Sequence, residues 1–342
     1  MNKTALTFLI ILLTCSPEHA ISQRIPWDET AELAQNASHP SPKMRYRLIQ
    51  SKLLDRNEIW ATASDQIGGF TEEDYQKLKP LIHGQNILSI QSHILAGDLT
   101  YEKLTQWYLY RIVKYENDRD KALNCIIAIN PGAVSEARQR DRERSADDHP
   151  IYGIPVLLKD NIGMSGMPTT AGAAALTDNH AADAFIVERL KEKGAIILGK
   201  TNLSEWANYL SSACPNGYSA VGGQTLNPYG RRKFDTGGSS SGSGASMAAG
   251  YAAAAVGTET SGSILSPSSA SSVVGLKPTV GLLSRSGIVP LSGTLDTPGP
   301  MTGTVIDNAI LLSAMCGEDS TDAVTKDNPK NILYWKDLGE SS

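Results

Sequence analysis

Short apolar runs alternate with helical patterns through the middle of this chain. Three of these runs, at Cys125–Ile129, Ile151–Leu158 and Ala195–Leu198, are continuously apolar, which is typical of strands buried on both faces. Helical spacing follows the first run over Ala133–Arg144 and precedes the third over His180–Lys193. Strands that alternate with helices predict an α/β fold, in which helices cover both faces of a parallel or mixed sheet.

The segment ahead of this α/β pattern is more polar. The stretch 23–84 predicts a helical N-terminal arm. Ser92–Glu116 then places apolar residues at helical spacing, with Asp98 or Thr100 as candidate helix caps. We therefore divide the chain into an arm over 23–84 and an α/β domain over 85–342.

The first 22 residues have the pattern of a signal peptide. Lys3 supplies a positive charge ahead of Ala5–Leu13, an apolar run that is too short to span a bilayer. Cleavage after Ser22 would fit the small residues there. The tetrapeptide LLTC, which ends at Cys15, resembles a lipoprotein box, so lipid attachment through Cys15 stays open. We expect export to the periplasm or the extracellular space, with no transmembrane span.

Composition excludes several functional classes. The 342 residues are 41% hydrophobic and 20% charged, which is typical of a globular protein. The formal net charge of -5 argues against a nucleic-acid-binding function. Outside the predicted signal peptide, Cys125, Cys214 and Cys316 are widely separated, and the six histidines form no ligand cluster. We expect neither a metal nor a cofactor.

The run Asp235–Thr279 carries the strongest chemical signal in the sequence. Two turns of glycine and serine or threonine, at 237–242 and 260–263, flank the alanine-rich run Ala245–Val256. Glycine lets a backbone approach another group closely, and a flexible linker would not enclose an apolar run of this length. We expect Ala245–Val256 to form one buried element with hydroxyl groups at both of its ends.

A catalytic serine on these turns would have to act without histidine. The GSSSG turn fits a nucleophile elbow centred on Ser240, but that fold needs a later histidine, and the last one here is His180. An unprotonated lysine can activate a serine instead. Lys159 follows a buried strand, where desolvation would disfavour its charge. The alternative for Lys159 is a salt bridge at the strand end, because Asp160 is adjacent.

Several motifs, in the same order along the chain, resemble the amidase signature family. They are GIPVLLKDNI at 153–162, GKTNLSE at 199–205, GQTLNPY at 223–229, GGSSSGS at 237–243, TETSGSI at 258–264 and GLKPTVG at 275–281. LDTPGPM at 295–301 is similar to the peptide-amidase-like branch of that family. The resemblance runs from about Ile94 to Cys316, and it identifies 85–342 as an amidase domain with the family's mixed sheet.

The resemblance implies a Ser-cisSer-Lys catalytic triad at Ser263, Ser239 and Lys159. Ser263 lies 24 positions after Ser239, which is the spacing that the family uses. Ser263 would attack the amide carbonyl, while Ser239 passes the proton to neutral Lys159. The resemblance also implies an oxyanion hole, formed by the backbone N–H groups of Thr260, Ser261, Gly262 and Ser263. The Ser240 hydroxyl would form a supporting hydrogen bond within the proton relay.

The chain departs from the family pattern in two respects. Ser261, Ala270 and Ser272 are small replacements near the nucleophile, and they bear on substrate fit and turn geometry. The larger departure is length, because family members generally continue well beyond the last residue here. We therefore expect a C-terminally truncated amidase-signature fold, in which part of the acyl pocket is missing.

The predicted function is that of an exported amidase. It would hydrolyse small carboxamides or the C-terminal amides of peptides, without a cofactor and without nucleic acid as a partner. Two alternatives stay open. One is an inactive fragment or pseudoenzyme, and the other is the glutaminyl/glutamyl-tRNA amidotransferase component that shares these motifs, whose cytosolic partners disagree with the signal sequence.

Overall fold

The computed structural model describes residues 28–211, 213–328 and 332–338. The predicted signal peptide at 1–22, including Cys15, lies outside the described residues. Within the described ranges, no helix is both long enough and apolar enough to cross a membrane.

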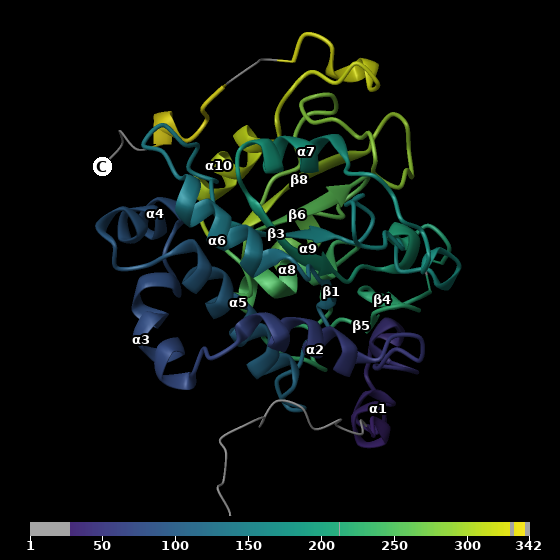
Figure 1. The fold of residues 1–342 in the computed structure, drawn as a ribbon. Coiled ribbons are helices and arrows are strands. Elements are labelled where there is room, and N and C mark those ends of the chain that lie inside the picture. The colour runs from purple at the N-terminus through teal and green to yellow at the C-terminus, as the bar shows by residue number, and fades with distance from the viewer. Residues whose placement is uncertain (1–27, 212, 329–331, 339–342) are drawn as a thin grey trace, which may run out of the picture.

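A six-stranded mixed sheet forms the centre of the molecule (Figure 1). In spatial order its strands are β1 (Ile126–Ile129), β3 (Ile196–Thr201), β2 (Pro155–Lys159), β6 (Ala254–Glu259), β8 (Thr297–Thr302) and β7 (Val274–Gly275). β2 runs parallel to both of its neighbours, β3 and β6, whereas β1, β8 and β7 pair antiparallel. A separate two-stranded sheet contains β4 (Tyr218–Ser219) and β5 (Gly223–Gln224). The predicted α/β class with a mixed sheet is confirmed.

Helices enclose this sheet. They are α1 (Thr30–Asn36), α2 (Arg56–Ile67), α3 (Glu72–Ile82), α4 (Ile87–Ala96), α5 (Tyr101–Glu116), α6 (Ala133–Glu143), α7 (Phe185–Glu192), α8 (Ser241–Ala248), α9 (Leu265–Ala270) and α10 (Val305–Met315). Short 3-10 helices lie at Pro42–Met44, Ala174–Leu176, Glu205–Asn208, Ala323–Thr325 and Lys336–Leu338. α8 packs against β2, β3, β6 and β8, while α10 packs against β6, β7 and β8. Every residue of β2, β3, β6 and β8 is buried, so both faces of the sheet are covered.

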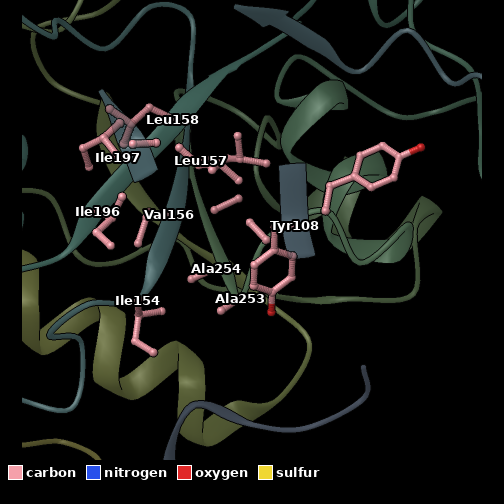
Figure 2. Packing of buried hydrophobic residues seen from close by; sticks show 14 of the residues in the cluster. Tyr108, Ile154, Val156, Leu157, Leu158, Ile196, Ile197, Ala253 and Ala254 are labelled. Atoms are coloured by element: carbon pink, nitrogen blue, oxygen red, sulfur yellow. The ribbon is translucent and has the colours of Figure 1, made fainter. Parts of the chain in front are cut away.

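The arm and the sheet share one hydrophobic core. Met44, Trp60 and Tyr75 from the arm belong to the same cluster as the strand residues. The Tyr75 ring stacks on Trp107 of α5 at a centroid distance of 5.0 Å, and the Trp107 indole N–H donates to the Tyr75 carbonyl at 3.0 Å. Figure 2 shows the centre of the core, with Val156, Leu157 and Leu158 of β2 beside Ile196 and Ile197 of β3.

Local signals explain where the predicted elements begin and end. Thr100, one of the two candidate caps, accepts a hydrogen bond from the Lys103 N–H at 3.1 Å and begins α5. β2 starts at Pro155, later than predicted, because Gly153 forms a turn at φ +69°. The Tyr101 ring fills the space that a Cβ at Gly153 would occupy. Lys159 is the last residue of β2, so the strand ends one position beyond the predicted end.

The prediction of a single element over Ala245–Val256 is wrong. The chain instead leaves α8 after Ala248, reverses direction, and enters β6 at Ala254. Gly250 makes the reversal possible with φ +68°, in the left-handed region that favours glycine. The run is rich in alanine and has no clear hydrophobic period, which favoured a single element, and Gly250 was the one residue within it that signals the end of a helix.

We predict that Gly199→Ala strongly destabilises the fold. A Cβ at Gly199 would lie 2.3 Å from the Ala128 carbonyl oxygen, at the point where β3 pairs with β1. The added methyl group would be overpacked against the backbone of β1, and this should lower the free energy of unfolding by about 1–3 kcal/mol. Urea denaturation measures the change. The control is Gly69→Ala, whose added Cβ meets no atom within 4 Å and should change stability by less than about 0.5 kcal/mol. Equal midpoints for the two variants would contradict the prediction.

Candidate active site

Lys159 lies at the centre of the candidate site. As the last residue of β2 it is fully buried between β3 and β6. Its Nζ lies 2.7 Å from the Ser239 hydroxyl oxygen, 2.9 Å from Thr258 Oγ1 and 3.2 Å from the Thr258 carbonyl oxygen. The structure therefore brings together Lys159 and Ser239, two of the three predicted triad residues, by a direct side-chain contact.

Burial makes this lysine a candidate base. Desolvation lowers the pKa of Lys159 from its ordinary value of 10.5 to about 7, although the Glu259 and Asp296 carboxylates act in the opposite direction. A neutral amine has two hydrogens and one lone pair. If Thr258 accepts both hydrogens, through its hydroxyl and its carbonyl oxygen, the lone pair is left for the Ser239 hydroxyl hydrogen.

Asp160 is not the partner of Lys159. The Asp160 carboxylate is buried and accepts hydrogen bonds from the backbone N–H and the hydroxyl of Thr170. It lies 3.5 Å from the Nζ of Lys200, a second buried lysine. The alternative interpretation of Lys159 as a salt-bridge partner of its neighbour is therefore wrong, because the two side chains have different partners.

Ser239 and Ser240 begin the segment that leads into α8. The Gly238–Ser239 peptide bond is cis. The Ser239 carbonyl accepts from the Ser204 N–H, and the Ser240 N–H donates to the Ser263 carbonyl, both at 3.0 Å. The Ser240 hydroxyl donates to the Thr258 carbonyl at 3.1 Å and accepts from the Thr258 N–H at 3.2 Å. Ser240 thus fixes the same threonine that binds Lys159.

Ser263 lies on the turn between β6 and α9. It is 7% exposed, and its hydroxyl forms no hydrogen bond with another described residue. The Ser240–Ser263 backbone hydrogen bond holds this turn beside the Ser239 segment. The two hydroxyls of Ser239 and Ser263 are not hydrogen bonded to each other here. Such contacts often tighten only when substrate binds.

The Glu259 carboxylate holds the turn in place. It is 4% exposed and accepts from the N–H groups of Gly262 at 2.8 Å, Ile264 at 2.7 Å and Leu265 at 2.9 Å. Gly262 has φ +85°, which favours glycine at this position. Three charge-assisted hydrogen bonds from backbone N–H groups to this one buried carboxylate fix the backbone around Ser263.

Glu259 also changes the expected oxyanion hole. The Gly262 N–H, one of its four predicted donors, is already hydrogen bonded to Glu259. The N–H groups of Thr260, Ser261 and Ser263 form no hydrogen bond with another described residue. They are the three donors of the turn that an oxyanion could still engage.

A cavity of about 470 Å³ adjoins this turn. Its wall includes Asn161, Thr258 and Thr260, which contact or neighbour the predicted triad, whereas the three predicted triad residues are not among the lining residues. The rest of the lining is largely apolar and includes Ala171, Trp206, Ala207, Ile288, Val289, Pro290 and Leu291. This size and character are typical of a small-molecule site.

The charged groups in the cavity wall are already paired. Arg285 donates twice to Asp322, at 2.6 and 2.9 Å. Asp296 accepts from the N–H groups of Leu291 and Ser292, at 2.7 and 2.8 Å, and from the Thr260 hydroxyl. Among the described residues, no group of three or more histidine, cysteine, aspartate or glutamate side chains could hold a metal ion.

Three residues of the site were given no role by the sequence analysis. Asn161, Thr258 and Glu259 all lie within quoted motifs, but their contacts depend on how β2 and β6 pair. The one available signal was an acidic residue at the start of the TETSGSI turn, where a carboxylate can accept several backbone N–H groups.

Comparisons with known proteins show which family the chain belongs to. The Amidase family model matches residues 103–340. A solved amidase family protein from Bacillus anthracis is 45% identical and has a TM-score of 0.81, with 84% of this chain and 58% of that chain covered. The native peptide amidase from Stenotrophomonas maltophilia is 45% identical with a TM-score of 0.68, covering 74% of this chain and 52% of its own. The chain belongs to the amidase family.

Curated relatives have the same similarity over part of their length. A protein from Arthroderma benhamiae whose name assigns it to the amidases is 38% identical over 297 residues, which are 84% of this chain and 48% of its own. A glutamyl-tRNA(Gln) amidotransferase component from Lawsonia intracellularis is 39% identical over 251 residues, 73% of this chain and 50% of its own. The chain spans about half the length of the curated relatives it matches.

We predict that Glu259→Gln slows acylation of the turn serine. The amide cannot accept all three N–H groups, so the turn loosens, and loss of the charge lowers the pKa of Lys159 further. Labelling by a fluorophosphonate should slow at least about tenfold, as expected from the loss of charge-assisted hydrogen bonds. Glu188→Gln, at an exposed position on α7, is the control and should label at the normal rate. Unchanged labelling of Glu259→Gln would show that the carboxylate does not organise the turn.

Proposed function

We propose that this protein is a serine amidase that hydrolyses neutral carboxamides through an acyl-enzyme on Ser263. The observation that carries the proposal is the buried contact of 2.7 Å between Lys159 and Ser239, at a lysine whose pKa is lowered to about 7. A lysine that is neutral near pH 7 can accept a proton, and a serine beside it can relay one.

The proposed reaction begins with attack of Ser263 Oγ on the amide carbon. Its proton passes to Ser239, whose own proton passes to Lys159 Nζ. The carbonyl oxygen gains negative charge near the N–H groups of Thr260, Ser261 and Ser263. Collapse of this intermediate breaks the C–N bond, and the relay returns the proton to the departing nitrogen. Water then attacks the acyl-enzyme by the same path, which releases the carboxylic acid and restores Ser263.

The cavity supports a neutral, largely apolar acyl group. Its walls are mostly apolar, and its four charged side chains, Glu259, Arg285, Asp296 and Asp322, are already hydrogen bonded within the protein. A volume of about 470 Å³ leaves room for more than a minimal amide. Amides of amino acids or short peptides are the proposed substrates, in line with the similarity to the Stenotrophomonas maltophilia peptide amidase.

Two further proposals rest on the sequence. Export, through the signal peptide at 1–22, would place the enzyme in the periplasm or outside the cell, with lipid attachment through Cys15 as an alternative. A second candidate function is that of a glutamyl-tRNA amidotransferase component, favoured by the match to the Lawsonia intracellularis protein. Ammonia release from a simple amide without tRNA would distinguish the amidase from that component.

The test of the proposed function is to replace the nucleophile. Ser263→Ala should abolish hydrolysis of amino-acid amides and covalent labelling by a fluorophosphonate, because the attacking oxygen is gone. Ser261→Ala, on the same turn, is the matched control and should keep its label. Mass spectrometry identifies the labelled residue. A label on Ser240 or Ser261, or a wild-type protein that neither labels nor hydrolyses amides, would refute the proposal.

We also predict the pH dependence. If neutral Lys159 is the base, kcat/KM should rise with pH through about 7, the pKa of the buried lysine, and level off above it. Lys159→Arg should lose about 100-fold or more of the activity, because guanidinium cannot accept a proton. Lys193→Arg, at the half-buried position just after α7, is the control and should retain activity. A pH-independent rate between pH 6 and 9, or an active Lys159→Arg enzyme, would exclude the lysine relay.

A further inference from the structure

Asn161 lies at the inner wall of the cavity, two residues after Lys159. It is 4% exposed. Its side-chain Nδ2 donates to Thr258 Oγ1 at 2.9 Å, and its carbonyl accepts from the Val289 N–H at 2.9 Å. These two contacts fix both the backbone and the side chain of Asn161 beside the hydroxyl that also binds Lys159.

The Asn161 Oδ1 atom has no hydrogen-bond partner among the residues that the structure describes. Among the described residues that line the cavity, Asn161 is the only one with a buried side-chain polar atom in this condition. A buried acceptor without a donor is unfavourable, so such an atom calls for an explanation. Within the described part of the chain Oδ1 therefore has no structural role, because the contact to Thr258 is made by Nδ2.

The chemistry of the proposed reaction supplies a donor for this atom. The substrate carbonyl has to face Ser263 and the N–H groups of the turn, so the nitrogen of the scissile bond needs its own partner. That nitrogen must also lie near the Lys159–Ser239 relay, which returns a proton to it. Thr258 joins Asn161 to this relay, since its hydroxyl contacts both Asn161 Nδ2 and Lys159 Nζ.

We propose that Asn161 Oδ1 accepts an N–H of the scissile carboxamide, so that Asn161 makes the site selective for amides over esters. The inference rests on the proposed amidase function. An amide brings an N–H that satisfies the buried acceptor, whereas the ester oxygen at the same position has no hydrogen to donate. A site that leaves a buried polar group unpaired discriminates against the analogue that lacks the matching group.

The test compares an amide and an ester with the same acyl group. For wild type, Asn161→Ala and Asn161→Asp, kcat/KM is measured for an amino-acid amide and for the corresponding methyl ester. Asn161→Ala removes the contact to Thr258 for both substrates but the acceptor Oδ1 only for the amide, so the amide-to-ester ratio of kcat/KM should fall by about 10- to 100-fold, the range expected for one hydrogen bond in a desolvated site. Asn161→Asp keeps an acceptor oxygen and should hold the amide-to-ester ratio within about threefold of wild type.

The control variant is Ser286→Ala. Ser286 lines the same cavity, but its hydroxyl is hydrogen bonded to Thr321 rather than to a group of the relay, so its removal should leave the ratio unchanged. Thermal melting checks that each variant is folded, and Asn161→Asp decides the outcome if Asn161→Ala does not fold. Equal losses of kcat/KM on the amide and the ester in Asn161→Ala, or a lower amide-to-ester ratio in Asn161→Asp, would overturn the proposed role of Asn161. Either result would leave the proposed amidase function standing. A wild-type protein that hydrolyses neither substrate would overturn the proposed function as well.

Discussion

The site depends on a buried lysine, Lys159, that forms no ion pair with any residue that the structure describes. A charged amine is unfavourable in such a place, and desolvation is the dominant cause of the lowered pKa of Lys159. Asp160, the nearest carboxylate in sequence, does not pair with Lys159, because it contacts Lys200 and Thr170 instead. Two adjacent buried residues therefore have opposite roles, because successive side chains of an extended chain point in opposite directions.

Parallel pairing of β2 with β6 positions the partners of this lysine. Leu158 is in register with Val256, so the end of β6 runs past the end of β2 and brings Thr258 to Lys159. The next residue, Glu259, turns its carboxylate onto the backbone around Ser263. The buried lysine and the turn that carries Ser263 are thus both held by the last two residues of β6.

The sequence predicted the parts of the site that depend on local order. Apolar runs located the strands around Lys159. The family resemblance, with its 24-residue spacing, selected Ser239 and Ser263; the structure shows Lys159 in contact with Ser239, and the catalytic roles stay predictions. The roles of Thr258, Glu259 and Asn161 were not predictable in this way, because they arise from the register between strands that are far apart in sequence. The prediction of one element over the alanine-rich run failed for a different reason, because the run has no clear hydrophobic period and the stop signal at Gly250 within it was not used.

Glu259 has two effects on the site that oppose each other: it orders the turn around Ser263, and it raises the pKa of Lys159. Its negative charge raises the pKa of Lys159, which opposes the desolvation that favours the neutral amine. The same carboxylate is needed on the turn, where it accepts three charge-assisted hydrogen bonds from backbone N–H groups. The arrangement keeps the turn rigid while it leaves the lysine pKa near 7, where both protonation states are populated and a proton can pass in either direction.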